Sequence, residues 1–332
     1  MNGVNETNKT NTSNELFTAD KIEAVKQEGR SLVRECIKER SRFSRVFETK
    51  NGEKAAVIYP KAVHFKKDDA WEVIDNTLVL SKDQLAYENA QGRMKVRIAR
   101  MPKQTDHKKK MMLFNLEEKQ NARSAQQDQT EEKSGIIELA SVEKDGFTIS
   151  WGLKTQKEKM QEEKPAMLSQ MNEPEVAAVP VEFKLNHPQT AEEKLLKLSK
   201  LSSAGYFREI LPGMDIRYRL ESEVVKEEII LKKKEAATET ITFVMKHPGL
   251  SMHVLADGSV ALCRMFAQEA KDTAEISDEN AVFFLDAPIL FDKNGEILKA
   301  AYQIEKGQGI SEITIKMDAS WLMDEGRAYP VT

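Results

Sequence analysis

The sequence lacks any long apolar run, and this absence excludes a helix that spans a membrane. Its longest apolar runs have four or five residues, whereas a transmembrane helix needs about 20 mostly apolar residues in succession. Residues 1–17 are rich in Asn and Thr, and they have neither the basic start nor the apolar core of a secretory signal peptide. We predict a disordered tail over 1–17 and no membrane span.

Motifs for metals, nucleotides and nucleophilic catalysis are also missing. The five histidines show no HxH or HxxxH spacing, and the two cysteines, Cys36 and Cys263, form no CxxC pair. No GxxxxGKS/T, GxGxxG or GxSxG segment is present to hold a phosphate, a dinucleotide or a catalytic serine. The sequence therefore predicts no metal, no cofactor and no catalytic residue. Apolar neighbours around both cysteines favour buried free thiols, with a single disulfide as the alternative.

Neither sign of charge dominates the composition. The chain has 50 basic and 54 acidic residues, a formal net charge of −4, and this near balance argues against nucleic acid as a partner. Hydrophobic residues make up 40% of 332 positions, enough for two ordinary domains with a buried core. The chain is therefore expected to fold.

One segment near the N-terminus has helical spacing. Apolar residues recur there at intervals of three, four and seven, with Lys, Glu and Arg between them, so we predict an amphipathic helix over 18–42. The stripe consists of Ile22, Val25, Leu32, Val33, Cys36 and Ile37.

From residue 43 the apolar spacing drops to two, which predicts a first β region over 43–153. The pair Asn51-Gly52 predicts a hairpin with a type I′ turn, because both residues tolerate positive φ angles. A second hairpin is expected around KKDDA, residues 66–70, and MMLFNLE is a further candidate strand. Residues 118–134 are almost wholly polar and predict a solvated loop.

A linker over 154–204 separates this region from a second β region over 205–332. Within the linker, Thr190 and Glu193 have the spacing of a capping box, so a short helix is predicted over 190–203. Short alternating strands follow one another to the C-terminus, with turn signals between them. The predicted fold is mainly β: antiparallel β-sandwich-like lobes, an N-terminal amphipathic helix and one short internal helix.

Residues 211–231, LPGMDIRYRLESEVVKEEIIL, hold eight charged side chains. These are either a catalytic patch of carboxylates or the solvent-facing charges of two β-strands. A glycosidase would need two of these carboxylates about 5–10 Å apart. Read with a period of two, the stretch is instead a hairpin with charges on one face that pair across the strands. Only Glu227 falls on the apolar face, where a carboxylate needs a partner or a raised pKa. We expect it in a structural pair or at a sheet edge.

Four blocks in order resemble the segment that precedes the repeats in large bacterial RHS/YD-repeat proteins. These include wall-associated proteins, polymorphic toxins and proteins with a DNRLRE domain, and the resemblance covers residues 43–332. The sequence departs from the family pattern in three ways: it lacks a signal peptide, it carries a polar insert at 118–134, and it stops at Thr332. The stop suggests that the second β region is truncated. The blocks are FETKNGEKAAVIYPKAVHFKKDDAWEVIDNTLV, LPGMDIRYRLESEVVKEEIIL, FFLDAPILFDKNGE and MDASWLMDEGRAYPVT.

The resemblance implies a non-enzymatic, β-rich structural or interaction module at the cell surface or outside the cell. Its partners would be other segments of the same long polypeptide, the repeat shell, and a cell-wall glycan is a further candidate. The missing signal peptide leaves a cytoplasmic location open. The alternatives are a carbohydrate-binding sandwich and, less favoured, a glycan-acting enzyme with a strand-borne carboxylate pair. The candidate binding residues are Asp215, Tyr218, Lys226, Glu227, Trp71 and Trp321.

Overall fold

The computed structural model describes residues 32–100, 135–155, 175–177, 198, 200–265 and 280–332. The chain forms two compact units, Met1–Glu72 with Val181–Leu198, and Val73–Pro180 with Ser199–Thr332. The division therefore falls inside the predicted first β region and differs from the predicted boundaries. The tail at 1–17, the candidate strand MMLFNLE, the loop at 118–134 and most of the linker lie outside the described residues.

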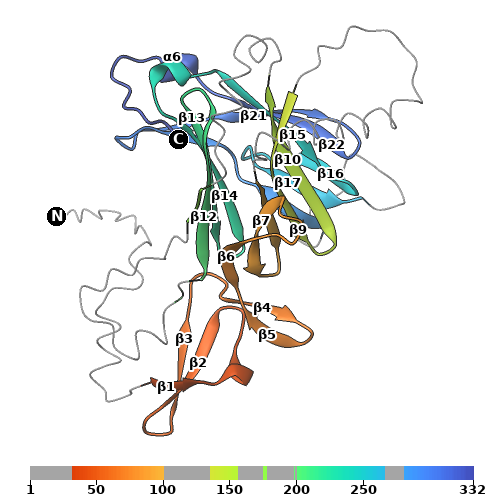
Figure 1. The fold of residues 1–332 in the computed structure, drawn as a ribbon, viewed down its shortest axis with the longest axis vertical. Coiled ribbons are helices and arrows are strands. Elements are labelled where there is room, and N and C mark those ends of the chain that lie inside the picture. The colour runs from red at the N-terminus through yellow and green to blue at the C-terminus, as the bar shows by residue number, and fades with distance from the viewer. Residues whose placement is uncertain (1–31, 101–134, 156–174, 178–197, 199, 266–279) are drawn as a thin grey trace, which may run out of the picture. The chain divides into compact units, whose positions relative to one another are not determined.

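The described part of the smaller unit is a three-stranded antiparallel sheet, in the order β1-β2-β3, and a separate β-hairpin (Figure 1). The predicted helix over 18–42 is wrong in its described part, because residues 32–42 contain a strand and a short 3-10 helix instead. Residues 18–31 lie outside the description. The elements are β1 (Leu32–Glu35), η1 (Ile37–Glu39), β2 (Ser44–Thr49), β3 (Lys54–Ile58), β4 (His64–Lys67) and β5 (Ala70–Val73).

A charge cluster explains why the helical spacing fails here. Glu35 at the end of β1 pairs with Arg45 on β2 at 2.6 Å and with Arg40 at 2.8 Å. Burial raises the pKa of Glu35, but the hydrogen bonds and charges of the two arginines outweigh it and lower that pKa to about 2. Together with the backbone pairing of β1 with β2, these contacts override a local helical pattern, because intrinsic helix propensities differ by less than about 1 kcal/mol for ordinary residues.

Both predicted hairpins of this region form, but the turn at Asn51-Gly52 is not of the predicted type. At Asn51-Gly52, only Gly52 has a positive φ, 77°, and the N–H of Gly52 donates to the Thr49 carbonyl at 3.0 Å. This is a three-residue loop with a bulge rather than a type I′ turn. The two positive φ angles occur instead in the second hairpin, at Asp68 (46°) and Asp69 (66°).

The larger unit is built on an eight-stranded antiparallel sheet in the order β21-β22-β15-β10-β9-β8-β7-β6 (Figure 1). It joins strands from both predicted β regions, so those regions share one sheet. Of these strands, β6 and β7 were not predicted. The bounds are β6 (Asp75–Leu80), β7 (Ala86–Gln91), β8 (Lys95–Ala99), β9 (Gly135–Lys144), β10 (Phe147–Thr155), β15 (Thr240–Lys246), β21 (Ala301–Lys306) and β22 (Ile310–Lys316).

A four-stranded sheet in the order β11-β12-β13-β14 packs on this sheet, and two smaller sheets complete the unit. The predicted helix over 190–203 is wrong at Ser202 and Ser203, which begin β12, and nearly all of its other residues are not described. The bounds are β11 (Glu175–Ala177), β12 (Ser202–Leu211), β13 (Met214–Glu221), β14 (Val224–Leu231), β16 (Leu250–Val254), β17 (Val260–Arg264), β18 (Ala281–Leu285), β19 (Ile289–Phe291), β20 (Ile297–Lys299), η3 (Lys234–Ala236) and α6 (Ala319–Leu322).

One apolar core lies between the sheets of the larger unit. The ring of Trp151 on β10 meets the ring of Tyr218 on β13 edge-on, with centroids 6.0 Å apart. A methyl group at Gly205 on β12 would lie 3.0 Å from Ile98 on β8, so the two sheets approach closely there. The fold is thus mainly β and sandwich-like, as the alternating pattern predicts. Cys263 lies buried on β17, and both cysteines are free thiols.

The last residues of the chain tie β14 to β19. Val331 and Leu231 exchange two backbone hydrogen bonds of 2.8 and 3.0 Å, and Thr332 exchanges two of 2.9 Å with Phe291. Nearby, the buried carboxylate of Asp292 accepts from the backbone N–H groups of Asn294 and Glu296 at 2.9 Å. The third and fourth sequence blocks therefore meet in one cluster.

The guanidinium of Arg327 closes this cluster. Its Nη1 lies 3.1 Å from Asp292 and its Cζ lies 3.5 Å from the Trp321 ring centroid. Burial raises the pKa of Asp292, but the backbone N–H groups of Glu296, Ala328 and Asn294, followed by Arg327, outweigh it and lower that pKa. The ionised carboxylate is therefore the form that the fold stabilises.

We expect Asp292→Asn to lower the thermal midpoint by several degrees at neutral pH, because Arg327 loses its buried partner. A depressed carboxyl pKa contributes stability above the unfolded-state pKa, near 4, and this contribution disappears as pH falls through the folded-state pKa. The difference from the unmutated chain should therefore shrink on acidification, as measured by thermal melts at pH 7 and pH 3. The control is Asp324→Asn, at an exposed carboxylate in the turn between α6 and Arg327. An equal loss in both variants would contradict this assignment.

Candidate functional site

Four of the six candidate binding residues lie on the hairpin of β13 and β14. Its register pairs Arg217 with Glu228 and Tyr218 with Glu227, so the predicted alternation of faces is confirmed. Of the other two candidates, Trp321 lies in α6, and Trp71 belongs to the smaller unit, where its carbonyl accepts from Arg40 at 3.4 Å. The structure thus brings four of the candidates together on one hairpin.

The outer face of the hairpin carries a network of ion pairs. Glu228 pairs with Arg217, and also with Arg219 at 2.9 Å. Glu221 pairs with Arg219 at 3.3 Å and with the candidate Lys226 at 3.4 Å. These contacts confirm that charges pair across the strands, and they occupy the carboxylates of both acids.

Asp215 is buried on the same face and holds a bulge in β12. Its carboxylate accepts the backbone N–H of Glu209 at 2.7 Å and pairs with Lys232 at 2.8 Å and Arg208 at 4.0 Å. Glu209 has a positive φ of 50°, and the strand register shifts between Phe207 and Leu211. Asp215 therefore supplies an acceptor for the irregular backbone of this bulge.

Glu227 lies on the opposite, core-facing side of the hairpin. The Tyr218 hydroxyl donates to its Oε1, and the Trp151 indole N–H donates to the same oxygen at 3.2 Å and to the Tyr218 hydroxyl oxygen at 3.0 Å. Its partners are thus a phenol and an indole rather than an arginine. Since β14 is the edge strand of the described four-stranded sheet, the second of the two expectations for Glu227, a place at a sheet edge, is the one that the structure shows.

The surroundings of Glu227 penalise its charged form relative to a carboxylate in water. Desolvation beside the core raises the pKa of Glu227, and the hydrogen bonds from Tyr218 and Trp151 only partly offset that rise. The residue as a whole is exposed at the edge, so water reaches it and limits this rise. Burial, with the negative charges of Glu227 and Asp286, also raises the pKa of Tyr302 on β21 to about 12. The carboxylate of Glu227 therefore contacts core side chains on one side and solvent on the other.

These placements separate the carboxylates of the catalytic alternative. Asp215 and Glu228 lie on the outer face of the hairpin, and Glu227 lies on the inner face, so the sheet itself stands between them. Trp321, the tryptophan that a carbohydrate-binding site could use for stacking on a sugar, already has one face covered by Arg327 at 3.5 Å. The outer-face carboxylates and Trp321 thus already have partners within the chain.

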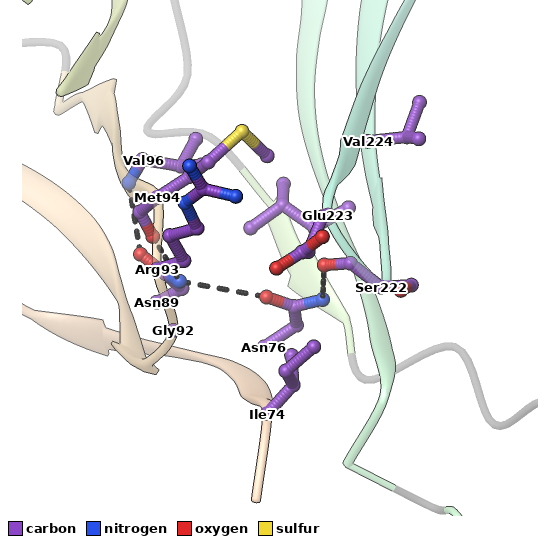
Figure 2. Close-up of a pocket in the computed structure, with 11 residues that line it drawn as sticks. Ile74, Asn76, Asn89, Gly92, Arg93, Met94, Val96, Ser222, Glu223 and Val224 are labelled. Atoms are coloured by element: carbon purple, nitrogen blue, oxygen red, sulfur yellow. Dashed lines mark hydrogen bonds between the residues drawn. The ribbon is translucent and has the colours of Figure 1, made fainter. Parts of the chain in front are cut away.

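A shallow recess lies where β6 and β7 meet the turn between β13 and β14 (Figure 2). It has room for about one water molecule. Arg93 and Glu223 lie at its rim, and Arg93 pairs with Asp145 at 2.8 Å. Asn76 and Asn89 line the recess, with Asn89 donating toward the Asn76 side-chain oxygen at 3.5 Å.

Asn76 is the residue that sequence reasoning missed. Its side-chain N–H groups donate to the carbonyl of Leu201 at 2.7 Å and of Ser222 at 2.9 Å, and its backbone N–H donates to Lys200 at 2.7 Å. The Ser203 hydroxyl donates back to the Asn76 carbonyl. Only the unusual polar pair DN inside the apolar block WEVIDNTLV signals this role.

Comparisons with known proteins give no further guide. No protein-family model matches the sequence, and neither a curated protein nor a solved structure matches it significantly. Among the described residues, no three His, Cys, Asp or Glu side chains are grouped to hold a metal ion. The helices described are too short or too polar to cross a bilayer.

We expect Asn76→Ala to lower the free energy of unfolding by about 1–3 kcal/mol, because the buried Ser222 carbonyl loses its donor. Urea unfolding monitored by tryptophan fluorescence measures this loss. The control is Asn294→Ala, which removes an exposed amide from a turn and should change stability by less than about 0.5 kcal/mol. Equal effects at both positions would contradict the role assigned to Asn76.

We expect Glu227→Gln to stabilise the chain at neutral pH and Glu228→Gln, one residue away, to destabilise it. A carboxyl whose folded-state pKa is raised loses stability as pH rises from the unfolded-state pKa through the folded-state pKa. Glutamine keeps the acceptor oxygen without the charge, so the advantage of Glu227→Gln should grow between pH 4 and pH 8. Urea unfolding at both pH values tests this. A pH-independent difference would show that Glu227 has an ordinary pKa.

Proposed function

We propose that the chain is a non-enzymatic structural and interaction module of a large bacterial RHS-like polypeptide, at the cell surface or secreted. The observation that carries the proposal is how the polar residues of the resembling blocks are used. Asn76, Asp215 and Asp292 each direct side-chain polar atoms to backbone groups of this chain. Residues with that role maintain a scaffold rather than bind a substrate.

The arrangement of the blocks supports a scaffold in a second way. The second block ends at Leu231, the fourth ends at Val331 and Thr332, and the third contains Phe291, and these segments are joined by backbone hydrogen bonds. Motif residues that are distant in sequence thus stabilise one β assembly. In the proposed function this assembly contacts other segments of the same polypeptide, the repeat shell.

A carbohydrate-binding sandwich is the alternative function. It would need exposed, coplanar aromatic faces, whereas Trp321 is stacked under Arg327 and Trp71 is half-buried. Glycan cleavage by a strand-borne carboxylate pair would need two acids on one side of the hairpin, free of ion pairs.

The test uses the purified chain with peptidoglycan and soluble cell-wall oligosaccharides. We expect no release of reducing ends, no saturable glycan binding by calorimetry, and reduced stability for Asp215→Asn. A separately produced YD-repeat tract should bind the unmutated chain. Glycan cleavage that disappears in Asp215→Asn would overturn the proposal in favour of an enzyme. Glycan binding that disappears in Trp321→Ala would favour the carbohydrate-binding alternative.

A further inference from the structure

The outer edge of β14 offers backbone groups in the correct register for one more strand. Leu231 exchanges both of its backbone hydrogen bonds with Val331, so its N–H and C=O point away from β13. Residues two apart in a strand point the same way, so the backbone groups of Val225, Glu227 and Ile229 also point outward. Among the described residues, none forms a ladder with these three positions.

We propose that this edge binds an extended segment of another polypeptide, which adds an antiparallel strand to β14 with a basic residue opposite Glu227. The bridge from Val331 to Leu231 is already the first rung of such a ladder, and the added strand continues it along the same edge. Strand addition gives affinity through backbone hydrogen bonds and specificity through alternate side chains.

The side chains of β14 define what the added strand carries. Val225, Glu227 and Ile229 share the core-facing side, opposite Leu220, Tyr218 and Ile216. Val225 and Ile229 are only partly buried at the edge, so apolar residues opposite them bury more apolar surface. A lysine or arginine opposite Glu227 gives its carboxylate a cation. The fitting segment therefore reads apolar, basic, apolar at alternate positions.

The same charges disfavour a second copy of this chain as the occupant. Two β14 strands related by a two-fold axis place one residue opposite itself at the centre of the pairing. A pairing centred on Lys226 or Glu228 sets like charges against each other without compensation. A pairing centred on Glu227 sets two Glu227 side chains against each other on the core-facing side, while Lys226 and Glu228 pair on the other side. Like charges directly opposite in a sheet are destabilising, and inward-pointing charges on edge strands prevent self-association.

The experiment uses the full chain and the peptide acetyl-Thr-Val-Thr-Lys-Thr-Val-Thr-amide at millimolar concentration. Backbone amide resonances of Val225, Glu227 and Ile229 should shift saturably, and those of Lys226 and Glu228, which bond β13, should shift less. The same peptide with Glu in place of Lys should bind about tenfold more weakly. The variant Glu227→Lys should reverse this preference.

A second variant keeps the test decisive if Glu227→Lys fails to fold. Ile229→Pro removes one outward N–H but no hydrogen bond to β13, so it should retain the fold and lose peptide binding. No saturable shift with the Lys peptide, or equal affinity for both peptides, would overturn the proposal. Concentration-dependent dimerisation through β14, seen by analytical ultracentrifugation, would show that the edge belongs to a second copy.

Discussion

The side-chain amide of Asn76 is the central contact at the junction of β6, the start of β12 and the β13–β14 turn in the larger unit. It joins β6, an edge strand of the eight-stranded sheet, to the start of β12 and to the turn between β13 and β14. The segments joined are 125 and 146 residues apart in sequence. A buried carbonyl without a donor costs free energy comparable to a lost hydrogen bond, so the amide stabilises this junction beyond the backbone bond from Asn76 to Lys200.

The same principle recurs at the other polar nodes. Asp215 bonds the backbone of a bulge, Asp292 bonds the backbone of a turn, and Arg327 closes the end of the chain over Trp321. Each node is a buried or half-buried polar group that stabilises irregular backbone which the sheets alone leave unpaired. Their shared chemistry explains why short motifs far apart in sequence define one scaffold.

The alternating pattern was enough to predict the mainly β fold and the charge pairing of the β13–β14 hairpin. It also placed Glu227 on the apolar face, because a period of two assigns faces without knowledge of partners. It could not predict that Leu32 and Glu35 form a strand, since that strand exists through its pairing with β2. Nor could it find Asn76, because its partners become neighbours only through sheet topology.

Glu227 shows how one residue can serve both the fold and its edge. On its inner side the carboxylate accepts hydrogen bonds from Tyr218 and Trp151, which positions it at the rim of the core. On its outer side it leaves a charge in the middle of an edge strand. An apolar residue there would bury more surface, but it would leave an edge that pairs without selection. The carboxylate thus gives up some stability, and the edge gains a preference for a cationic strand.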